Sequence, residues 1–369
     1  MDFRARTERL LEQADIRIDG DRPQDMQVHE PRLYRRIFAE GSLGFGEAYI
    51  EGWWDCQRLD EFFYQVFRLP QIEDIERINT ARLRWLSRLT DMQSLRRAVQ
   101  VGEKHYDAGN DLFAKMLDRN MIYSCGYWSS AADLDAAQLA KLDLVAKKID
   151  LKPGMRVLDI GCGWGGAARH FAREYGVEVV GITISREQAA WARQWCEGLP
   201  VEVRIQDYRL IEGRFDAIYS IGMFEHVGYK SYRAYFEVAR RCLSDQGLFL
   251  LHTIGNNITT THTDPWIHKY IFPNGMLPSA AQISSACEGL FVMEDWHNFG
   301  PDYDRTLMCW YENFERAYPE LAAAYPQDFR RMWHYYLLSC AATFRARRAQ
   351  LWQVLLAPPT RTAAAPVVR

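Results

Sequence analysis

A glycine-rich segment, VLDIGCGWGG at 157–166, is the first place where residue types and spacing point to chemistry. Gly161, Gly163 and Gly166 have the G-x-G-x-x-G spacing that lets the backbone between a strand and a helix approach a nucleotide closely. Dinucleotide folds also place an acidic residue about 20 positions after the first glycine. The chain reads VVGITIS there and carries Asp159 before the glycines instead. These observations leave open a dinucleotide or a different nucleoside ligand.

The segments around these glycines alternate between strand-like and helix-like patterns. We expect strands at 155–161, 177–185, 201–208, 215–224 and 247–255, and helices at 165–176, 186–198 and 229–244. Strands that alternate with helices indicate an α/β fold with a doubly wound parallel sheet. Before them, residues 1–75 show the mixed pattern of a small α+β domain.

Ligands of such sheets bind beyond the carboxyl ends of the strands. Glu225, in EHVG, and His252, in HTIG, lie at the carboxyl ends of the fourth and fifth expected strands, which in the usual order are adjacent to the first. Both side chains are therefore expected to face the glycine loop. A capping or other structural role is the alternative for each, but burying an ionised glutamate unpaired costs several kcal/mol, which favours function.

Composition excludes several classes of protein. The chain has 369 residues and a net charge of −3, which argues against nucleic-acid binding. Its eight cysteines form no C-x-x-C pair and have no histidine at zinc spacing, so we expect no metal site and a reduced, cytoplasmic protein. No stretch approaches 18 apolar residues, so we expect no membrane span.

A basic segment at 76–100 separates the expected N-terminal module from the rest. Its arginines could contact anionic lipid head groups, or the segment could be a solvated linker helix. The arginines are Arg82, Arg84, Arg88, Arg96 and Arg97. We therefore expect four segments: a module at 1–75, a linker helix at 76–100, a catalytic domain at 101–360 and a flexible tail at 361–369.

The glycine segment and several longer motifs resemble one family of enzymes. The apolar–Asp–apolar–GCG order resembles motif I of class I S-adenosylmethionine (SAM) methyltransferases, and the other motifs resemble the cyclopropane and mycolic acid synthases, especially the cyclopropane-fatty-acyl-phospholipid synthases. Those motifs are HYDAGNDLFAKMLDRNMIYSCGYW at 105–128, QDYR at 206–209, MFEHVG at 223–228, LHTIG at 251–255, DPWIHKYIFPNG at 264–275, EDWHNFGPDYDRTL at 294–307 and FRAR at 344–347.

The resemblance implies a Rossmann-like SAM-methyltransferase fold and a specific reaction. A methylene group passes from SAM to the cis double bond of an unsaturated phospholipid acyl chain, through a carbocation that bound bicarbonate deprotonates as the ring closes. Aromatic faces can stabilise such a cation by roughly 0.5–2 kcal/mol each. The candidates for this role are Tyr123, Tyr127, Trp128, Tyr270 and Tyr303, with plain core packing as the alternative for all but Tyr303.

The resemblance also assigns residues to the two small ligands. The bicarbonate cage comprises Cys125, Glu225, His252, the backbone of Ile254, and Tyr303. The SAM site comprises Tyr123, Ser124, Asp159, Gly161, Gly163, Gly165, Thr183, Gln188, Asp207 and Tyr208. Glu225 must accept a hydrogen bond from bicarbonate or be protonated, because two bare anions repel. Cys340 matches a cysteine marked as catalytic in the synthases, but a packed helical cysteine is the alternative because the reaction needs no covalent enzyme intermediate.

Partners follow from the same resemblance. We expect the N-terminal module and the basic segment to dock reversibly on the inner membrane from the cytoplasmic side, and the chain to form a homodimer through that module. Two other functions remain open: a different SAM methyltransferase with an amine, branched-methyl or hydroxy-methyl product, and a lipid-binding protein without catalysis.

Overall fold

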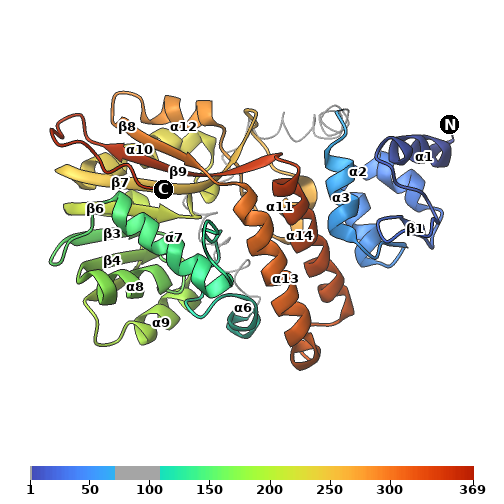
Figure 1. The fold of residues 1–369 in the computed structure, drawn as a ribbon, viewed down its shortest axis with the longest axis horizontal. Helices are drawn as coiled ribbons and strands as arrows, with labels where there is room; N and C mark the ends of the chain where they lie inside the picture. Colours follow the sequence, from blue (N-terminus) through green and yellow to red (C-terminus); the bar gives the residue numbers. More distant parts are fainter. Residues whose placement is uncertain (1, 71–108) are drawn as a thin grey trace. The chain divides into compact units, whose positions relative to one another are not determined.

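The computed structural model describes residues 2–70 and 109–369 and divides them into two compact units (Figure 1). Among these residues, the first unit comprises 2–70, Thr261–Pro273 and Tyr303–Ala349, and the second comprises 109–260, Asn274–Asp302 and Gln350–Arg369. The basic segment expected at 76–100 lies outside the described residues. The division into four segments stays a prediction.

The second unit contains a seven-stranded sheet with the strand order β5-β4-β3-β6-β7-β9-β8. Its strands are β3 (Arg156–Ile160), β4 (Glu178–Thr183), β5 (Val201–Ile205), β6 (Phe215–Ile221), β7 (Leu243–Asn256), β8 (Val292–Asn298) and β9 (Ala349–Ala357). Its helices are α6 (Asn110–Met116), α7 (Leu134–Lys148), α8 (Gly166–Tyr175), α9 (Arg186–Trp195), η1 (Tyr208–Leu210), η2 (Phe224–His226), η3 (Tyr229–Ser231), α10 (Tyr232–Cys242) and α12 (Ala280–Cys287).

The first five of these strands, β3 to β7, lie where the sequence predicts them and pair in parallel. The expected neighbours of the first strand are also confirmed, because β3 pairs with β6 and β6 pairs with β7. One strand is longer than expected: β7 begins at Leu243 and continues through His252 and Ile254 to Asn256. The α/β fold with a doubly wound sheet is thus confirmed.

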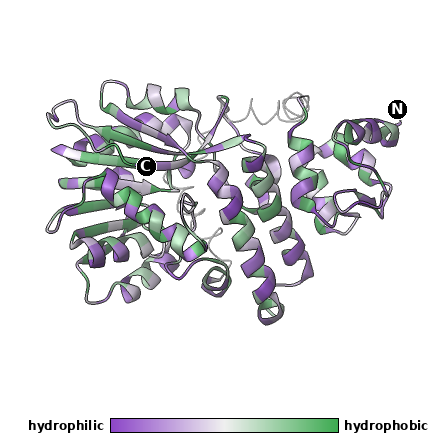
Figure 2. Ribbon diagram, viewed as in Figure 1, coloured by the Kyte–Doolittle hydropathy of each residue, from purple (hydrophilic) through white to green (hydrophobic). Residues whose placement is uncertain are grey.

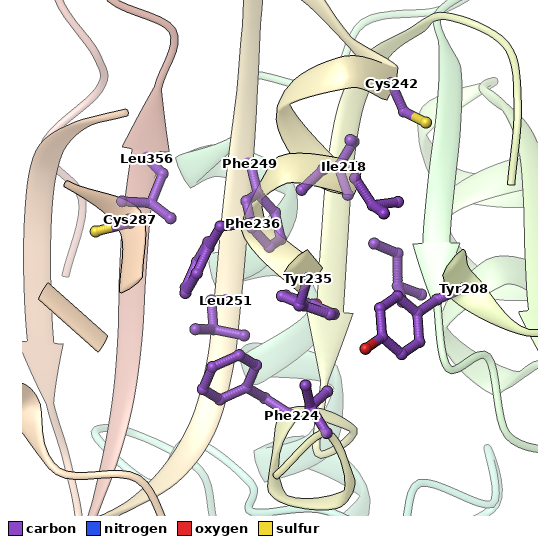
Figure 3. Close-up of a cluster of buried hydrophobic side chains, with 14 of the residues drawn as sticks. Tyr208, Ile218, Phe224, Tyr235, Phe236, Cys242, Phe249, Leu251, Cys287 and Leu356 are labelled. Atoms are coloured by element: carbon purple, nitrogen blue, oxygen red, sulfur yellow. The ribbon is translucent and has the colours of Figure 1, made fainter. Parts of the chain in front are cut away.

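Helices cover both faces of the sheet because successive strand residues point to opposite sides. On one face, Leu158 and Ile160 of β3 pack with buried residues of α10 and α12. Figure 3 shows this cluster, in which Phe236 of α10 and Phe249 of β7 lie among the apolar side chains. On the other face, Val157 packs with residues of α7 and α8. Hydrophobic residues dominate the central strands accordingly (Figure 2).

The strands β8 and β9 were not predicted. They pair antiparallel, from Val292 opposite Ala357 to Asn298 opposite Trp352. Every residue of β9 is buried, so its sequence AQLWQVLLA lacks the alternation of polar and apolar residues that marks a half-exposed strand.

At the end of the chain, Arg369 forms an ion pair with Asp295 of β8. The flexibility expected for 361–369 stays a prediction.

The first unit is mostly helical, and residues 2–70 contribute a two-stranded antiparallel sheet to it, in line with the mixed pattern expected there. Its elements are α1 (Phe3–Gln13), β1 (Gln27–Val28), α2 (Leu33–Ile50), β2 (Trp54–Asp55), α3 (Leu59–Phe67), α11 (Pro265–Tyr270), α13 (Pro301–Leu321) and α14 (Gln327–Arg345). Aromatic rings form its core: Tyr335 of α14 contacts Phe63 of α3 and Trp266 of α11. The N-terminal helices therefore share one core with α14.

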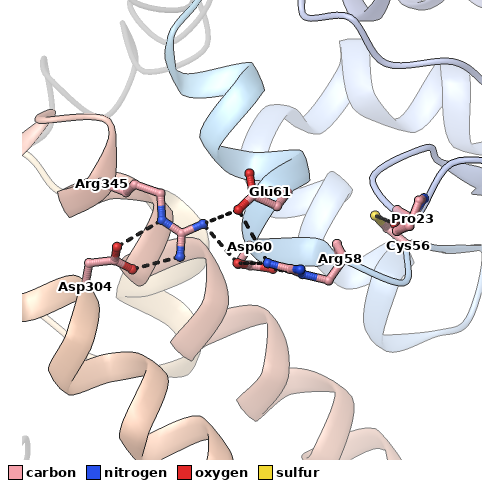
Figure 4. A network of polar contacts seen from close by, with 7 residues as sticks. All are labelled: Pro23, Cys56, Arg58, Asp60, Glu61, Asp304 and Arg345. Atoms are coloured by element: carbon pink, nitrogen blue, oxygen red, sulfur yellow. Dashed lines mark hydrogen bonds and ion pairs between the residues drawn. The ribbon is translucent and has the colours of Figure 1, made fainter.

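Arg345 connects three helices of this first unit (Figure 4). It donates to Asp60 and Glu61 of α3 at 2.9 and 2.8 Å, and to both carboxylate oxygens of Asp304 on α13. Arg345 belongs to the FRAR motif, so the structure gives that motif a role in joining α14 to α3 and α13.

Within the described ranges, no helix combines the length and apolar character needed to span a bilayer.

Candidate active site

The glycine loop of the second unit runs from the end of β3 to the start of α8. The N–H groups of Gly161 and Cys162 donate to the carbonyl of Ile182 on the neighbouring strand, at 3.0 and 2.9 Å. A Cβ on Gly166 would come within 1.9 Å of the Asn120 carbonyl oxygen, so only glycine fits there. A Cβ on Gly163, where φ is +52°, would meet no atom within 4 Å. The loop is thus fixed on one side and open at Gly163, as a ligand-binding loop requires.

Two further predicted cofactor segments follow β4 and β5, the next strands along the sheet. After β4, the Thr183 hydroxyl donates to Gln188 Oε1 at 3.1 Å, which joins these two predicted residues directly. After β5, Asp207 accepts hydrogen bonds from the backbone and side chain of Arg209. Tyr208 is buried and contacts the Tyr235 ring edge-on. Because parallel strands end at one edge of the sheet, these segments lie along the same edge as the glycine loop.

Asp159 is buried in β3, directly before the glycine loop. Its Oδ2 accepts a hydrogen bond from the Tyr219 hydroxyl on β6 at 2.8 Å. Burial raises the pKa of Asp159 to about 7, while Tyr219 and Lys141 oppose that rise. Tyr219 of the neighbouring strand therefore holds this carboxyl, and its contact with a cofactor stays a prediction.

Glu225 and Ile254 are joined at the carboxyl ends of β6 and β7. The backbone N–H of Ile254 donates to Glu225 Oε1 at 2.7 Å. Burial raises the pKa of Glu225 to about 7, so the protonated and ionised forms are both populated near neutral pH. Among the described residues, the buried Glu225 Oε2 has no hydrogen-bond partner. The carboxyl is thus anchored by one oxygen and offers the other to a ligand.

His252 lies two residues before Ile254 and is fully buried. Its Nδ1 lies 3.3 Å from Gln353 Nε2, whereas its Nε2 has no partner within the described part of the chain. Burial, with the positive charges of Lys141 and Lys148, lowers the pKa of His252 well below its ordinary value. The imidazole is therefore neutral, and its Nε2 is a second buried polar atom left for a ligand.

The predicted residues Tyr123, Ser124 and Cys125 are consecutive and are supported by α7. Gln138 Nε2 donates to the Ser124 carbonyl at 2.7 Å, and Lys141 Nζ donates to the Ser124 hydroxyl oxygen at 2.9 Å. Cys125 is fully buried and its thiol donates to the Gly126 carbonyl. A Cβ on Gly222 would lie 3.7 Å from Ser124 Cβ, which places Ser124 at the end of β6.

Tyr303 and Cys340, the remaining predicted residues, belong to the first unit. Tyr303 on α13 is buried against Trp310 and Phe344. Cys340 lies on α14, and burial raises the pKa of its thiol to about 12. A thiol that stays protonated is a poor nucleophile, which favours the packed helical cysteine. The catalytic assignment of Tyr303 stays a prediction.

Comparison with known proteins decides between the families that share this fold. The family described as mycolic acid cyclopropane synthetase matches residues 93–354. The chain belongs to this family. The cyclopropane-fatty-acyl-phospholipid synthase of Escherichia coli (strain K12) is 55% identical over 353 residues, covering 94% of this chain and 91% of that protein.

Solved structures of the mycolic acid cyclopropane synthetase family show the same fold. The cyclopropane synthase MmaA2 from Mycobacterium tuberculosis is 31% identical with a TM-score of 0.67, covering 70% of this chain and 98% of that one. The mycolic acid cyclopropane synthase CmaA1, complexed with SAH and CTAB, is 31% identical with a TM-score of 0.65, covering 70% of this chain and 97% of that one. The chain thus has the class I SAM-methyltransferase fold.

Two buried polar residues of the site were missed from the sequence: Gln138 and Lys141, which hold the Ser124 backbone and hydroxyl. A signal was present, because both fall on the helical face that includes the buried Leu142 and Val145. Polar residues on the apolar face of a helix need buried partners, and here those partners belong to a predicted cofactor segment.

Proposed function

We propose that this chain transfers a methylene group from SAM to the cis double bond of an unsaturated phospholipid acyl chain and closes a cyclopropane ring. The observation that carries the proposal is the 55% identity over 94% of the chain to the Escherichia coli cyclopropane-fatty-acyl-phospholipid synthase. That similarity extends beyond the 93–354 region shared with the wider family.

The residues at the strand ends fit SAM. Gly161, Gly163 and Gly165 would let the backbone approach the ligand, and Thr183 and Gln188 would contact its ribose and methionine parts. Asp207 and Tyr208 would lie near the adenine, and Tyr123, Ser124 and Asp159 would complete the site. SAM supplies a methyl group on a sulfonium, which an aligned alkene can attack. The open space at Gly163 supports this fit.

Residues at the ends of β6 and β7 fit a small anionic base, for which we propose bicarbonate. Glu225 Oε2 and His252 Nε2 are buried and unpartnered among the described residues, so each gains a hydrogen bond when a ligand binds. A pKa of about 7 lets Glu225 meet the anion as a protonated donor, or as an acceptor for its hydroxyl. Cys125 and Tyr303 would complete the cage. Bicarbonate would supply the base that takes a proton from the new methyl group.

Membrane docking and dimerisation form the second part of the proposal. The 76–100 segment would bind anionic lipid head groups of the inner membrane from the cytoplasmic side, and the N-terminal module would pair two copies. Simple deletion of residues 1–75 is a poor test of docking, because α2 and α3 share an aromatic core with α14. Charge reversal in the basic segment changes none of the aromatic residues named in that core.

The direct test incubates the protein with methyl-labelled SAM and vesicles of unsaturated phospholipid, followed by mass spectrometry of acyl chains and head groups. We expect label in acyl chains that have lost their double bond, and little in the Glu225→Ala variant. Glu315→Ala is the matched control, because Glu315 is a half-buried carboxylate that pairs with Arg330 and His334 in the first unit. Label in amine head groups would indicate a different methyltransferase, and no label would indicate a non-catalytic lipid-binding protein.

A further inference from the structure

Helix α7 carries two fully buried lysines, and they differ in their partners. Lys148 forms an ion pair with Asp295 at 3.4 Å and a hydrogen bond with His297 at 3.1 Å. Lys141, seven residues earlier, donates to the Ser124 hydroxyl oxygen at 2.9 Å. Within the described residues this hydroxyl is the one hydrogen-bond partner of Lys141, and no carboxylate lies within ion-pair distance of it. Burying an ammonium that is paired with one neutral hydroxyl and no carboxylate costs free energy, which points to a functional reason for this lysine.

Carboxyl groups near Lys141 are already engaged by other donors. Asp118 accepts the backbone N–H groups of Asn120 and Ile122, at 2.9 and 2.8 Å. Asp159 accepts the Tyr219 hydroxyl. Both interact with Lys141 electrostatically without contacting it, as does Cys125. Burial lowers the pKa of Lys141 to about 8, which leaves it mainly charged at neutral pH. Its ammonium has three donors, of which Ser124 takes one.

The Lys141 contact determines how Ser124 can bind a ligand. A serine hydroxyl has one hydrogen to donate and two lone pairs to accept with. Because Lys141 donates to this oxygen, the hydroxyl hydrogen points away from the cation and is available for an acceptor. Gln138 fixes the Ser124 carbonyl at the same time. Ser124 therefore presents a donor, beside a positive charge, at the end of β6.

We propose that Lys141 is a positioning residue that orients the Ser124 hydroxyl toward the carboxylate at the amino-acid end of SAM. The inference rests on the proposed function. The other charged groups of SAM are cations, an ammonium and a sulfonium, and a buried lysine would repel both. The carboxylate is the part of the ligand that gains from a donor hydroxyl backed by a positive charge.

Two related ligands test the proposal by isothermal titration calorimetry. S-adenosylhomocysteine retains the amino-acid end, and 5′-methylthioadenosine lacks it. For Lys141→Met we expect the Kd of S-adenosylhomocysteine to rise at least about tenfold, the effect of losing a charge-assisted hydrogen bond, and that of 5′-methylthioadenosine to change less than about twofold. Lys148→Met is the matched control, with the same helix and burial, and should leave both Kd values unchanged.

Ser124→Ala should reproduce the selective loss, and the double variant should lose less than the two single variants combined. If Lys141→Met fails to fold, the Ser124→Ala variant alone tests the proposal. The test is then whether its Kd for S-adenosylhomocysteine rises more than its Kd for 5′-methylthioadenosine. The proposal is overturned if both ligands weaken equally, if neither weakens, or if Lys148→Met has the same effect. Failure of the unmodified protein to bind S-adenosylhomocysteine would instead overturn the proposed function.

Discussion

The backbone N–H of Ile254 donates a 2.7 Å hydrogen bond to Glu225 Oε1, which fixes a buried carboxyl between the ends of two neighbouring strands. The two residues are 29 positions apart, and the parallel pairing of β6 and β7 brings them together. Glu225 Oε2 stays without a partner among the described residues. A carboxyl held in this way costs stability when it ionises and can serve a ligand when one binds.

Glu225→Gln should become more stable than the unmodified protein as pH rises. The folded pKa of Glu225 is about 7, against an ordinary 4.5, so the folded state holds this proton more tightly than the unfolded state does. Stability of the unmodified protein therefore falls between about pH 4.5 and 7, and glutamine has no charge to bury. Over that range we expect the difference in free energy of unfolding to shift by about 3 kcal/mol in favour of the variant.

Urea unfolding at a series of pH values measures this difference. The other acids with raised pKa values, Asp118, Asp159 and Asp264, are present in both proteins, so their effects cancel. A difference that does not change with pH would show that Glu225 is not buried as a carboxyl with a raised pKa.

Gly163→Ala should weaken cofactor binding more than it affects folding. Gly163 and Gly154 both have positive φ, +52° and +82°, and a Cβ on either would meet nothing within 4 Å. Alanine should therefore cost each site about 1–2 kcal/mol of stability. At Gly163 the added methyl also occupies the space expected to hold the ligand, so we expect the Kd of S-adenosylhomocysteine to rise at least about tenfold. Gly154→Ala, in the turn before β3, should bind S-adenosylhomocysteine normally. If both variants have the same Kd for this ligand, the open space at Gly163 does not belong to the ligand site.

Much of the fold could be predicted because its signals are local. The strands β3 to β7 each show an apolar run beside a helical pattern, and the parallel order then follows from general rules of topology. The same rules predict that Glu225 and His252 lie at the carboxyl edge of the sheet. They do lie there, because β3, β6 and β7 are neighbours.

Features that depend on distant partners could not be predicted in this way. Arg345 donates a hydrogen bond to Asp60, which lies 285 positions away, and the local sequence around either residue does not predict this contact. Lys141 can be recognised as a polar residue on the apolar face of α7, but its partner Ser124 cannot be predicted from the sequence. The strand β9 is buried along its whole length, so it lacks the alternation that would have identified it.

Arg345→Ala should destabilise the protein substantially. The substitution removes the hydrogen bonds to Asp60, Glu61 and Asp304, and the side chain of Asp60 is only 4% exposed. Asp60 keeps its pair with Arg58, so the expected cost is that of losing charge-assisted hydrogen bonds in a partly buried network, about 2–3 kcal/mol. Arg4→Ala is the control, because its pair with Glu8 is exposed to solvent and should contribute little to stability. Equal effects in chemical denaturation would mean that the Arg345 network does not stabilise the fold.

Charge reversal in the basic segment should separate membrane binding from catalysis. Replacing Arg82, Arg84, Arg88, Arg96 and Arg97 by glutamate removes attraction worth about 1 kcal/mol per residue to anionic lipid. We expect co-sedimentation with anionic vesicles to fall at least about tenfold, and turnover of phospholipid dispersed in detergent to stay within about twofold. Unchanged vesicle binding would contradict the docking role.

In the proposed reaction, the carbon delivered by SAM ends in a ring after one of its hydrogens is removed. Supplying SAM with a fully deuterated methyl group and analysing the acyl chains by mass spectrometry and NMR tests this most directly. We expect cyclopropane chains that retain two of the three deuterons, with strongly reduced product from Glu225→Gln. Acyl chains that retain all three deuterons in an intact methyl group would rule out ring closure by proton removal.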